Sequence, residues 1–119
     1  MLRPSDDLPR VYLCREPVDM RKSIDGLAAL VEGQLALDPF SSHLFAFTNR
    51  RKDKVKILYW ERTGFCLWYK RLEKAQFRWP THLSGEPITL TGRELNWLLD
   101  GFDLKHWRPH PALAYHSVL

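Results

Sequence analysis

Three β-prone runs, separated by two polar tetrapeptides, most strongly constrain what this chain can fold into. They occupy residues 44–49, 54–60 and 65–71. Each run is rich in aromatic and aliphatic residues, and loops of four residues join antiparallel neighbours in hairpins. The pattern therefore predicts a three-stranded antiparallel meander, in which Asn49 faces Lys54 and Trp60 faces Phe65.

A first helix is predicted to start at Met20. Apolar residues recur from this point at steps of three or four, which places them on one stripe of a helix. They are Met20, Ile24, Leu27, Val31 and Leu35. Asp38-Pro39 is expected to end the helix, because proline removes a backbone donor and clashes with the preceding turn.

Further elements flank the meander. Residues 11–14 and 88–90 have the composition of short strands. Thr91 and Glu94 have the spacing of a capping box that starts a second helix, and Gly101 suits its C-terminal end. The sequence thus predicts a small single domain of the α+β class, an antiparallel meander sheet of four to five strands packed with two helices.

The domain is expected to span residues 11–104, between a flexible leader at 1–10 and an irregular tail at 105–119. Prolines interrupt both ends, and the tail also carries three histidines. No apolar run approaches the roughly 20 residues of a membrane span, and the first residues lack the order of a secretory signal. We therefore expect a cytoplasmic protein without membrane contact, in which Cys14 and Cys66 stay reduced.

Side-chain alternation divides the meander into two faces. One face is almost entirely apolar, and the stripe of the first helix is expected to cover it. It carries Leu44, Ala46, Val55, Ile57, Tyr59, Cys66 and Trp68. The other face is mixed, and apolar residues at one end of it are candidates for a protein interface. They are Phe45, Phe47, Leu58, Trp60, Phe65 and Leu67.

Positive charge is concentrated in the same stretch. Residues 50–78 hold ten Lys or Arg against three acids, whereas the rest of the chain has eight bases and eleven acids. The mixed face is expected to end in a group of cations that we call the basic corner. It consists of Arg50, Arg51, Lys52, Lys54, Lys56 and Arg71, with Tyr69 beside it. Cations neutralise phosphates and aromatic rings stack on bases, so the corner predicts nucleic-acid binding; a solvated hairpin is the alternative.

Two smaller basic groups are further candidates. Arg21 and Lys22 fall in the first turn of the predicted helix, where exposed backbone amides could join them in holding a phosphate. The run at residues 69–74, together with Arg78, places several cations near Trp79. In both cases the alternative is a solvated surface without a ligand.

The sequence offers no pattern for catalysis, a metal or a cofactor. It contains no nucleophile elbow, no phosphate-binding glycine loop and no Cys-x-x-Cys. A metal-dependent nuclease needs carboxylates gathered around divalent ions, but the acids here are scattered at caps and turns. His106 and His110 stand four residues apart, but Pro109 breaks the helix that this spacing would need. We therefore expect a non-catalytic protein, with a small nuclease as the last of the alternatives.

Several motifs together resemble one known family. They are the helix start DMRKSIDGL at 19–27, the strand KILYW at 56–60, the segment WYKRLE at 68–73 and FRWP at 77–80. Over residues 10–116 the chain is similar to the TnpB-type, or Orf2-like, accessory proteins of insertion-sequence-66 type bacterial transposons. The resemblance implies a small protein that is encoded beside a transposase and assists transposition without being the transposase itself.

Two functions follow as alternatives. In the first, the basic corner binds DNA, at the element ends or without specificity, mostly through phosphates. In the second, the chain is an interaction module that docks on the transposase of the same element or forms a homo-oligomer, without direct DNA contact. The two differ in salt dependence, because phosphate binding weakens steeply as salt rises whereas apolar docking does not.

Overall fold

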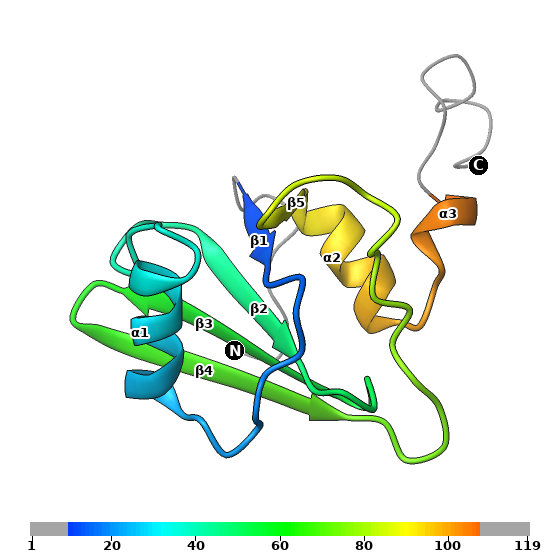
Figure 1. Cartoon of the computed structure of the whole chain (residues 1–119), viewed down its shortest axis with the longest axis horizontal. Coiled ribbons are helices and arrows are strands. Elements are labelled where there is room, and N and C mark those ends of the chain that lie inside the picture. Colours follow the sequence, from blue (N-terminus) through cyan, green and yellow to red (C-terminus); the bar gives the residue numbers. More distant parts are fainter. Residues whose placement is uncertain (1–9, 108–119) are drawn as a thin grey trace.

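Five strands form one sheet in the computed structural model, which describes residues 10–107 (Figure 1). The strands are β1 (Val11–Leu13), β2 (Leu44–Thr48), β3 (Lys54–Glu61), β4 (Gly64–Arg71) and β5 (Ile88–Leu90). The helices are α1 (Ile24–Gly33), α2 (Gly92–Leu99) and the single turn α3 (Leu104–Trp107). The order across the sheet is β4-β3-β2-β1-β5, which confirms a small α+β fold.

The meander of β2, β3 and β4 has the predicted register. Trp60 pairs with Phe65 across the β3–β4 turn. In the β2–β3 hairpin, Thr48 pairs with Val55, the register in which Asn49 and Lys54 also face each other. The side chain of Asn49 secures this end, because its Oδ1 accepts the backbone N–H of Lys54 at 3.1 Å. A one-residue slip would move every buried side chain to the opposite face, so burial on both faces holds the register.

One pairing departs from the predicted antiparallel sheet. β1 lies parallel to β2, with Val11 beside Leu44, and antiparallel to β5 on its other side. The connection from β1 to β2 contains α1, which supplies the long crossover that parallel neighbours need. The sheet is therefore mixed, and β1 joins the N-terminal part of the chain to β5.

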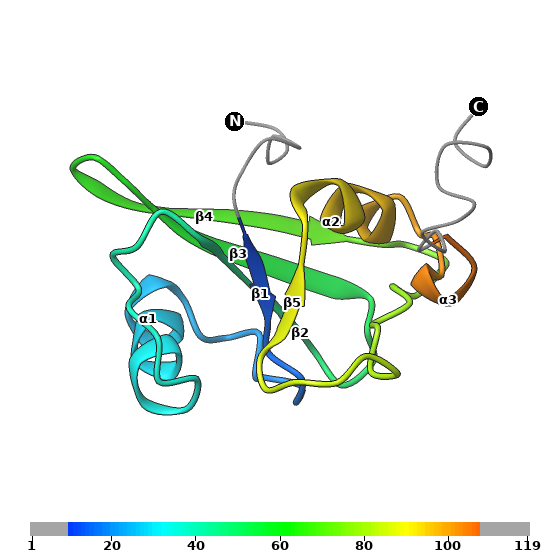
Figure 2. The ribbon, with the colours of Figure 1, turned by 90° about the horizontal axis from the view of Figure 1, so that it is seen from above.

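Helices α1 and α2 cover opposite faces of the sheet (Figure 2). One cluster joins residues of α1 to one face, and consists of Cys14, Leu27, Val31, Leu35, Phe45, Phe47 and Leu58. The other cluster joins α2 and α3 to the second face, and its members include Leu44, Ala46, Val55, Ile57, Leu95, Leu98, Leu99 and Leu104. The expectation that the first helix covers the Leu44 and Ala46 face is wrong. Both faces of β2 are apolar, so alternation alone did not indicate which helix covers which face.

Helix α1 is shorter than predicted. It starts at Ile24 instead of Met20 and ends at Gly33, before Asp38-Pro39. Asp19 Oδ1 accepts the backbone N–H of Arg21 at 2.9 Å, and the carbonyl of Asp19 accepts that of Lys22 at 3.0 Å, so these residues form a separate turn before the helix. Residues 20–22 therefore form a loop that leads into the helix.

The second helix follows the sequence prediction. Thr91 Oγ1 accepts the backbone N–H of Glu94 at 3.1 Å, and Glu94 Oε1 accepts that of Thr91 at 2.9 Å, which completes the capping box. Gly101 follows the helix with φ 94°, a conformation that favours glycine. The prediction of irregular chain from Lys105 is wrong for its first residues, since α3 includes Lys105 and is anchored by the fully buried Leu104.

Most of the predicted leader and tail cannot be compared with the structure, because residues 1–9 and 108–119 lie outside the described residues.

The two cysteines are both free thiols. Burial raises the pKa of Cys14. Between residues 10 and 107, no helix has the length and apolar character needed to cross a membrane.

Candidate nucleic-acid interface

The β2–β3 turn presents Arg50 and Arg51 to solvent on a well-braced frame. The carbonyl of Asn49 accepts the N–H of Lys52 at 3.1 Å, and Asn49 Nδ2 donates to Asp53 Oδ1 at 2.7 Å. This side-chain hydrogen bond is the main cause of the lowered pKa of Asp53. Among the described residues, the side chains of Arg50 and Arg51 have no hydrogen bond or ion pair. Both guanidinium groups are therefore available to an anion.

The sheet register brings the other residues of the basic corner to the same end of the hairpin. Lys54 pairs with Arg71, and Lys56 pairs with Tyr69. The ring of Tyr69 is 49% exposed, and Lys56 Nζ lies 5.7 Å from its centroid. Cations from the β2–β3 turn and from β4 thus share one surface, with an exposed aromatic ring beside them.

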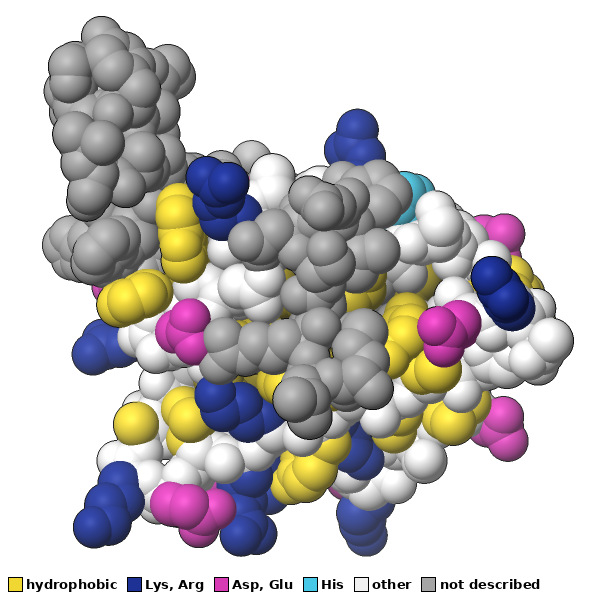
Figure 3. Space-filling model, turned by 180° about the vertical axis from the view of Figure 1, so that it is seen from behind, with side chains coloured by type: hydrophobic (Ala, Val, Ile, Leu, Met, Phe, Trp, Pro, Cys, Tyr) yellow, Lys and Arg dark blue, Asp and Glu magenta, His cyan; other side chains and the backbone are white. Residues whose placement is uncertain are grey.

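Part of the charge in the basic corner already has partners within the protein. Lys56 Nζ donates to the carbonyl oxygens of Met20 at 2.6 Å and Lys22 at 2.8 Å. Arg71 Nε lies 2.8 Å from Glu73 Oε2, an ion pair that raises the pKa of Arg71. Seen from behind, basic side chains along the lower edge of the protein are interspersed with acidic ones (Figure 3). The charge available for binding is therefore smaller than the sequence count suggests.

Arg21 and Lys22 lie beside the basic corner, because Lys56 holds their loop against β3. The prediction that they occupy the first turn of a helix is wrong, since the helix starts after Ser23. Arg21 pairs with Asp19 at 2.6 Å, and its hydrogen bonds lower the pKa of Asp19 to about 2. The Arg21 side chain is nevertheless 91% exposed. The two cations therefore extend the corner instead of forming a separate site at the helix start.

Half of the predicted interface residues belong to the core. Phe45, Phe47 and Leu58 are each 0% exposed, because α1 covers their face of the sheet. The expectation that these three side chains are exposed is wrong. Trp60, Phe65 and Leu67 remain partly accessible, and the last two pack against the same cluster.

Phe40 completes a ring cluster with Trp60 and Phe65 near the β3–β4 turn. The centroid of Phe40 lies 5.0 Å from that of Trp60 and 5.1 Å from that of Phe65, and the last two are also 5.1 Å apart. Phe40 is 54% exposed. Its position after Asp38-Pro39 marks a turn, and Asp38 Oδ1 indeed accepts its N–H at 2.9 Å. The pattern of strands gave no reason to place Phe40 here, so the sequence analysis missed it.

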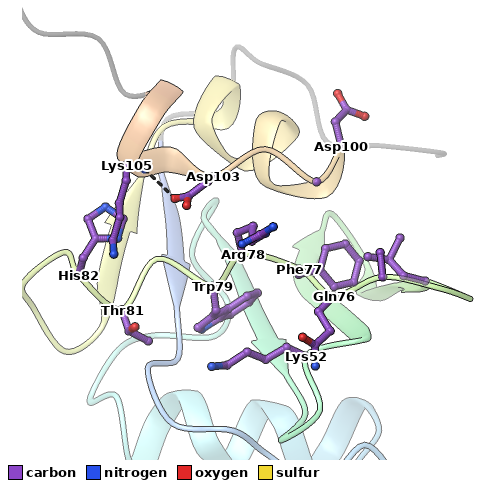
Figure 4. A pocket seen from close by; sticks show the side chains of 13 residues that line it. Lys52, Gln76, Phe77, Arg78, Trp79, Thr81, His82, Asp100, Asp103 and Lys105 are labelled. Carbon is purple, nitrogen blue, oxygen red and sulfur yellow. Dashed lines mark hydrogen bonds between the residues drawn. The ribbon is translucent and has the colours of Figure 1, made fainter.

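The basic run at residues 69–74 divides between two roles. Lys70 Nζ donates to the carbonyl of Leu99 at 2.9 Å and so stabilises the C-terminal end of α2. Arg78, in contrast, is exposed between the buried Phe77 and Trp79. It lines a groove of about 880 Å³ (Figure 4).

The groove contains basic residues that the sequence analysis did not select. His82 and Lys105 line it together with Lys52 and Arg78. Arg78 stands between two aromatic residues, Phe77 and Trp79, and this alternation in the sequence indicates that Arg78 points outward when its neighbours are buried. No comparable signal marks His82 or Lys105, because their approach to the groove depends on the tertiary fold.

Carboxylates and other metal ligands are dispersed over the described part of the chain. Among the side chains of residues 10–105, no three His, Cys, Asp or Glu are grouped so that they could hold a metal ion. Glu94 belongs to the capping box, and Asp38 and Asp53 brace turns. His110 lies outside the described residues.

Comparison with known proteins identifies the family. The profile described as IS66 Orf2 like protein matches residues 9–109. The chain belongs to the IS66 Orf2-like family. The uncharacterized protein y4hO of Sinorhizobium fredii is 34% identical over 110 residues, which cover 89% of this chain and 95% of that protein. The uncharacterized protein y4jC of the same organism is 35% identical over 103 residues, 82% of this chain and 87% of that protein. No solved structure matches the chain.

As an IS66 Orf2-like protein, the chain is an accessory protein associated with an insertion sequence. The matched range contains all of the strands and helices described above. The basic corner, the ring cluster and the groove therefore all lie within the part of the chain that defines the family.

Proposed function

We propose that this IS66 Orf2-like protein assists transposition by binding DNA of the element through the phosphates, with the basic corner as the contact surface. One observation carries the proposal. Lys56 bonds to the backbone of the 20–22 loop, so Arg21 and Lys22 join Arg50 and Arg51 on one end of the sheet. Two basic segments that are distant in sequence thus converge on one surface.

The chemistry of this surface suits a sugar-phosphate backbone. Arg50 and Arg51 are exposed, project from a braced turn and carry planar guanidinium groups that match phosphate geometry. Tyr69 adds an exposed ring beside them. The most exposed cations lie on the β2–β3 turn and on the 20–22 loop, where they can reach phosphates. The binding should therefore be weakly sequence-specific, because phosphate contacts position a protein without reading bases.

Fluorescence anisotropy tests the proposal with labelled element-end DNA and unrelated duplex DNA of equal length, each over a salt series. Replacing Arg50 and Arg51 with Ala should weaken binding to both duplexes. The slope of log K against log salt should become shallower by about 2, and affinity should fall roughly 30-fold near 0.15 M salt.

A matched control removes the same charge elsewhere. Arg62 lies on the β3–β4 turn and Arg93 on α2, and both are exposed. Replacing this pair with Ala should leave affinity within about twofold, because neither residue belongs to the corner. Equal losses for the two double variants would mean that net charge, and not the corner, determines binding.

The ring cluster of Phe40, Trp60 and Phe65 supports a second candidate, docking on the transposase of the same element. Exposed aromatic groups are typical of the centres of protein interfaces. The Phe40 ring is more than half exposed although it contacts two other rings. In this case, co-purification with the transposase should persist at high salt and be lost when Phe40 is replaced with Ser, whereas Arg50 and Arg51 should not matter.

A further inference from the structure

The groove of about 880 Å³ lies between the β4–β5 connection and the turn that joins α2 to α3. Lys52 reaches it from the β2–β3 turn, Arg78 and Trp79 from the connection, and Lys105 from α3. Figure 4 shows the side chain of Lys52 extending below Trp79, with Arg78 between Trp79 and the helices. The groove is thus built from segments that only the tertiary fold brings together.

The wall that carries Arg78 is fixed to the core. Phe77 is 1% exposed, and its N–H donates to the carbonyl of Lys52 at 2.7 Å. Trp79 is 6% exposed, and its Nε1 donates to the carbonyl of Cys14 at 3.0 Å. Arg78 stands between these two anchors, so its backbone is fixed at the groove before any ligand arrives. A preformed site loses less conformational freedom on binding.

The rim beyond Trp79 is also braced. Arg15 Nη1 donates to the carbonyl of Thr81 at 2.8 Å, and Arg15 Nη2 donates to that of Gly85 at 2.9 Å and to that of Leu83. Thr81 and the neighbouring His82 both line the groove. Three carbonyl groups on one guanidinium hold this loop in place, although the loop has no regular secondary structure.

The charge within the groove favours an anion. Three cations line it against two acids, Asp100 and Asp103. Asp103 is committed to the start of α3, because its Oδ1 accepts the backbone N–H of Lys105 at 3.0 Å. Figure 4 shows the carboxylate of Asp100 pointing away from Arg78 and Trp79. The two carboxylates therefore repel an anion inside the groove less strongly than their number suggests.

The size of the groove selects the form of the anion. A DNA duplex is a convex rod whose major groove alone is about 12 Å wide. It can rest on the β2–β3 turn, but it cannot enter a hollow of about 880 Å³, which is within the range of small-ligand pockets. A few nucleotides of a single strand can enter.

The groove is continuous with the basic corner. Lys52 belongs to both, and Gln76 lines both the groove and an adjoining hollow of about 370 Å³. The hollow is also lined by Arg51 and Lys74, and by two acids, Asp53 and Glu73, whose carboxylates are bonded to Asn49 and Arg71. A strand that leaves a duplex at Arg51 would therefore meet further cations along its path to Arg78 and Lys105.

From this geometry we infer that the groove binds a single-stranded DNA segment that continues from a duplex held on the basic corner. The inference rests on the proposed function, and it adds a preference for DNA with an unpaired end. Arg78 and Lys105 contact phosphates of the unpaired strand, and the corner contacts phosphates of the duplex.

Fluorescence anisotropy with four probes tests the inference on the full chain. The probes are a blunt duplex, the same duplex with a six-nucleotide tail on either the 3′ or the 5′ end, and the tail strand alone. One tail polarity should raise affinity about tenfold over the blunt duplex near 0.15 M salt, because two further phosphates release counterions. Replacing Arg78 and Lys105 with Ala should remove this gain and leave blunt-duplex affinity unchanged.

The variants separate the possible failures. Replacing Arg50 and Arg51 with Ala should weaken binding of both duplex forms, and the Arg62 and Arg93 control should alter neither. The inference fails, while the proposed function stands, if the blunt duplex binds and a tail does not raise the affinity. The same holds if a tail raises the affinity equally after Arg78 and Lys105 are replaced. Absence of binding to every probe at low salt overturns the proposed function as well. If the Ala variant unfolds, Arg78→Gln with Lys105→Gln applies the same test.

Discussion

The two ends of the β3–β4 hairpin differ in chemistry although one continuous ladder joins them. At the turn end, Trp60 and Phe65 are paired, and Phe40 packs on both rings. At the open end, Lys54 is paired with Arg71, next to the exposed arginines of the β2–β3 turn. Both ends belong to the same antiparallel ladder, and their side chains differ in what they can bind.

The two ends also differ in how much of their surface serves stability. The rings at the turn end contact one another, and Phe65 also packs against the α1 cluster. At the open end, Lys56 holds a loop, whereas Arg50 and Arg51 have no such task among the described residues. Charged side chains without a partner inside the protein indicate a binding surface better than charged side chains that hold the fold together. The following variants test this division of roles.

Among the variants that test stability, Lys56→Met is expected to lower the free energy of unfolding the most. The change keeps the apolar stem but removes the ammonium that bonds to the carbonyl groups of Met20 and Lys22. Charged hydrogen bonds of this kind contribute about 2 kcal/mol to the free energy of unfolding, so urea denaturation should show a loss of that size. Lys54→Met is the control, because the Lys54 ammonium contacts only Asp53 at 3.6 Å and should matter little. Equal stabilities for the two variants would contradict a structural role for Lys56.

A smaller effect is expected from the rings at the turn end. Phe40→Ala and Trp60→Leu, alone and together, form a double-mutant cycle for a contact with centroids 5.0 Å apart. The coupling energy should be about 1 kcal/mol, since edge-to-face aromatic pairs contribute that much beyond the area they bury. A coupling energy of zero would show that the contact between Phe40 and Trp60 adds nothing to the stability of the fold.

The smallest effect concerns the acid end of the pH range. Hydrogen bonds from Arg21 lower the pKa of Asp19 from 3.8 to about 2 in the folded protein. A lowered pKa stabilises the fold above the unfolded value, and this contribution is lost as the pH falls from about 4 to about 2. Asp19→Asn should therefore reduce the melting temperature slightly at pH 6 and flatten its decline below pH 4. An unchanged slope in the variant would show that the ion pair at this exposed site is not linked to folding.

Local patterns predicted most elements of the fold. Alternation and loop length placed the meander in its register, and the capping box located the start of α2. The start of α1 was misplaced, because an apolar stripe at helical spacing continues through Met20 although residues 19–22 form a separate turn. Periodicity reports which side chains are buried, and it does not report where the helical backbone begins.

The candidate site was predictable only in part. The sequence located the cations of the basic corner, because pairing in a hairpin follows from register. It assigned Phe45, Phe47 and Leu58 to the surface, because alternation separates two faces without indicating that both are covered. It missed Phe40 and Lys105, whose neighbours come from distant segments.

The sequence by itself determined the class of fold, the register of the meander and the concentration of positive charge, since each depends on residues that are near neighbours in the chain. Only the tertiary structure decided the parallel place of β1, the face that each helix covers, and which cations remain exposed. These features depend on contacts such as Lys56 with the 20–22 loop and Trp79 with Cys14, which join segments whose order in sequence carries no information about their distance in space.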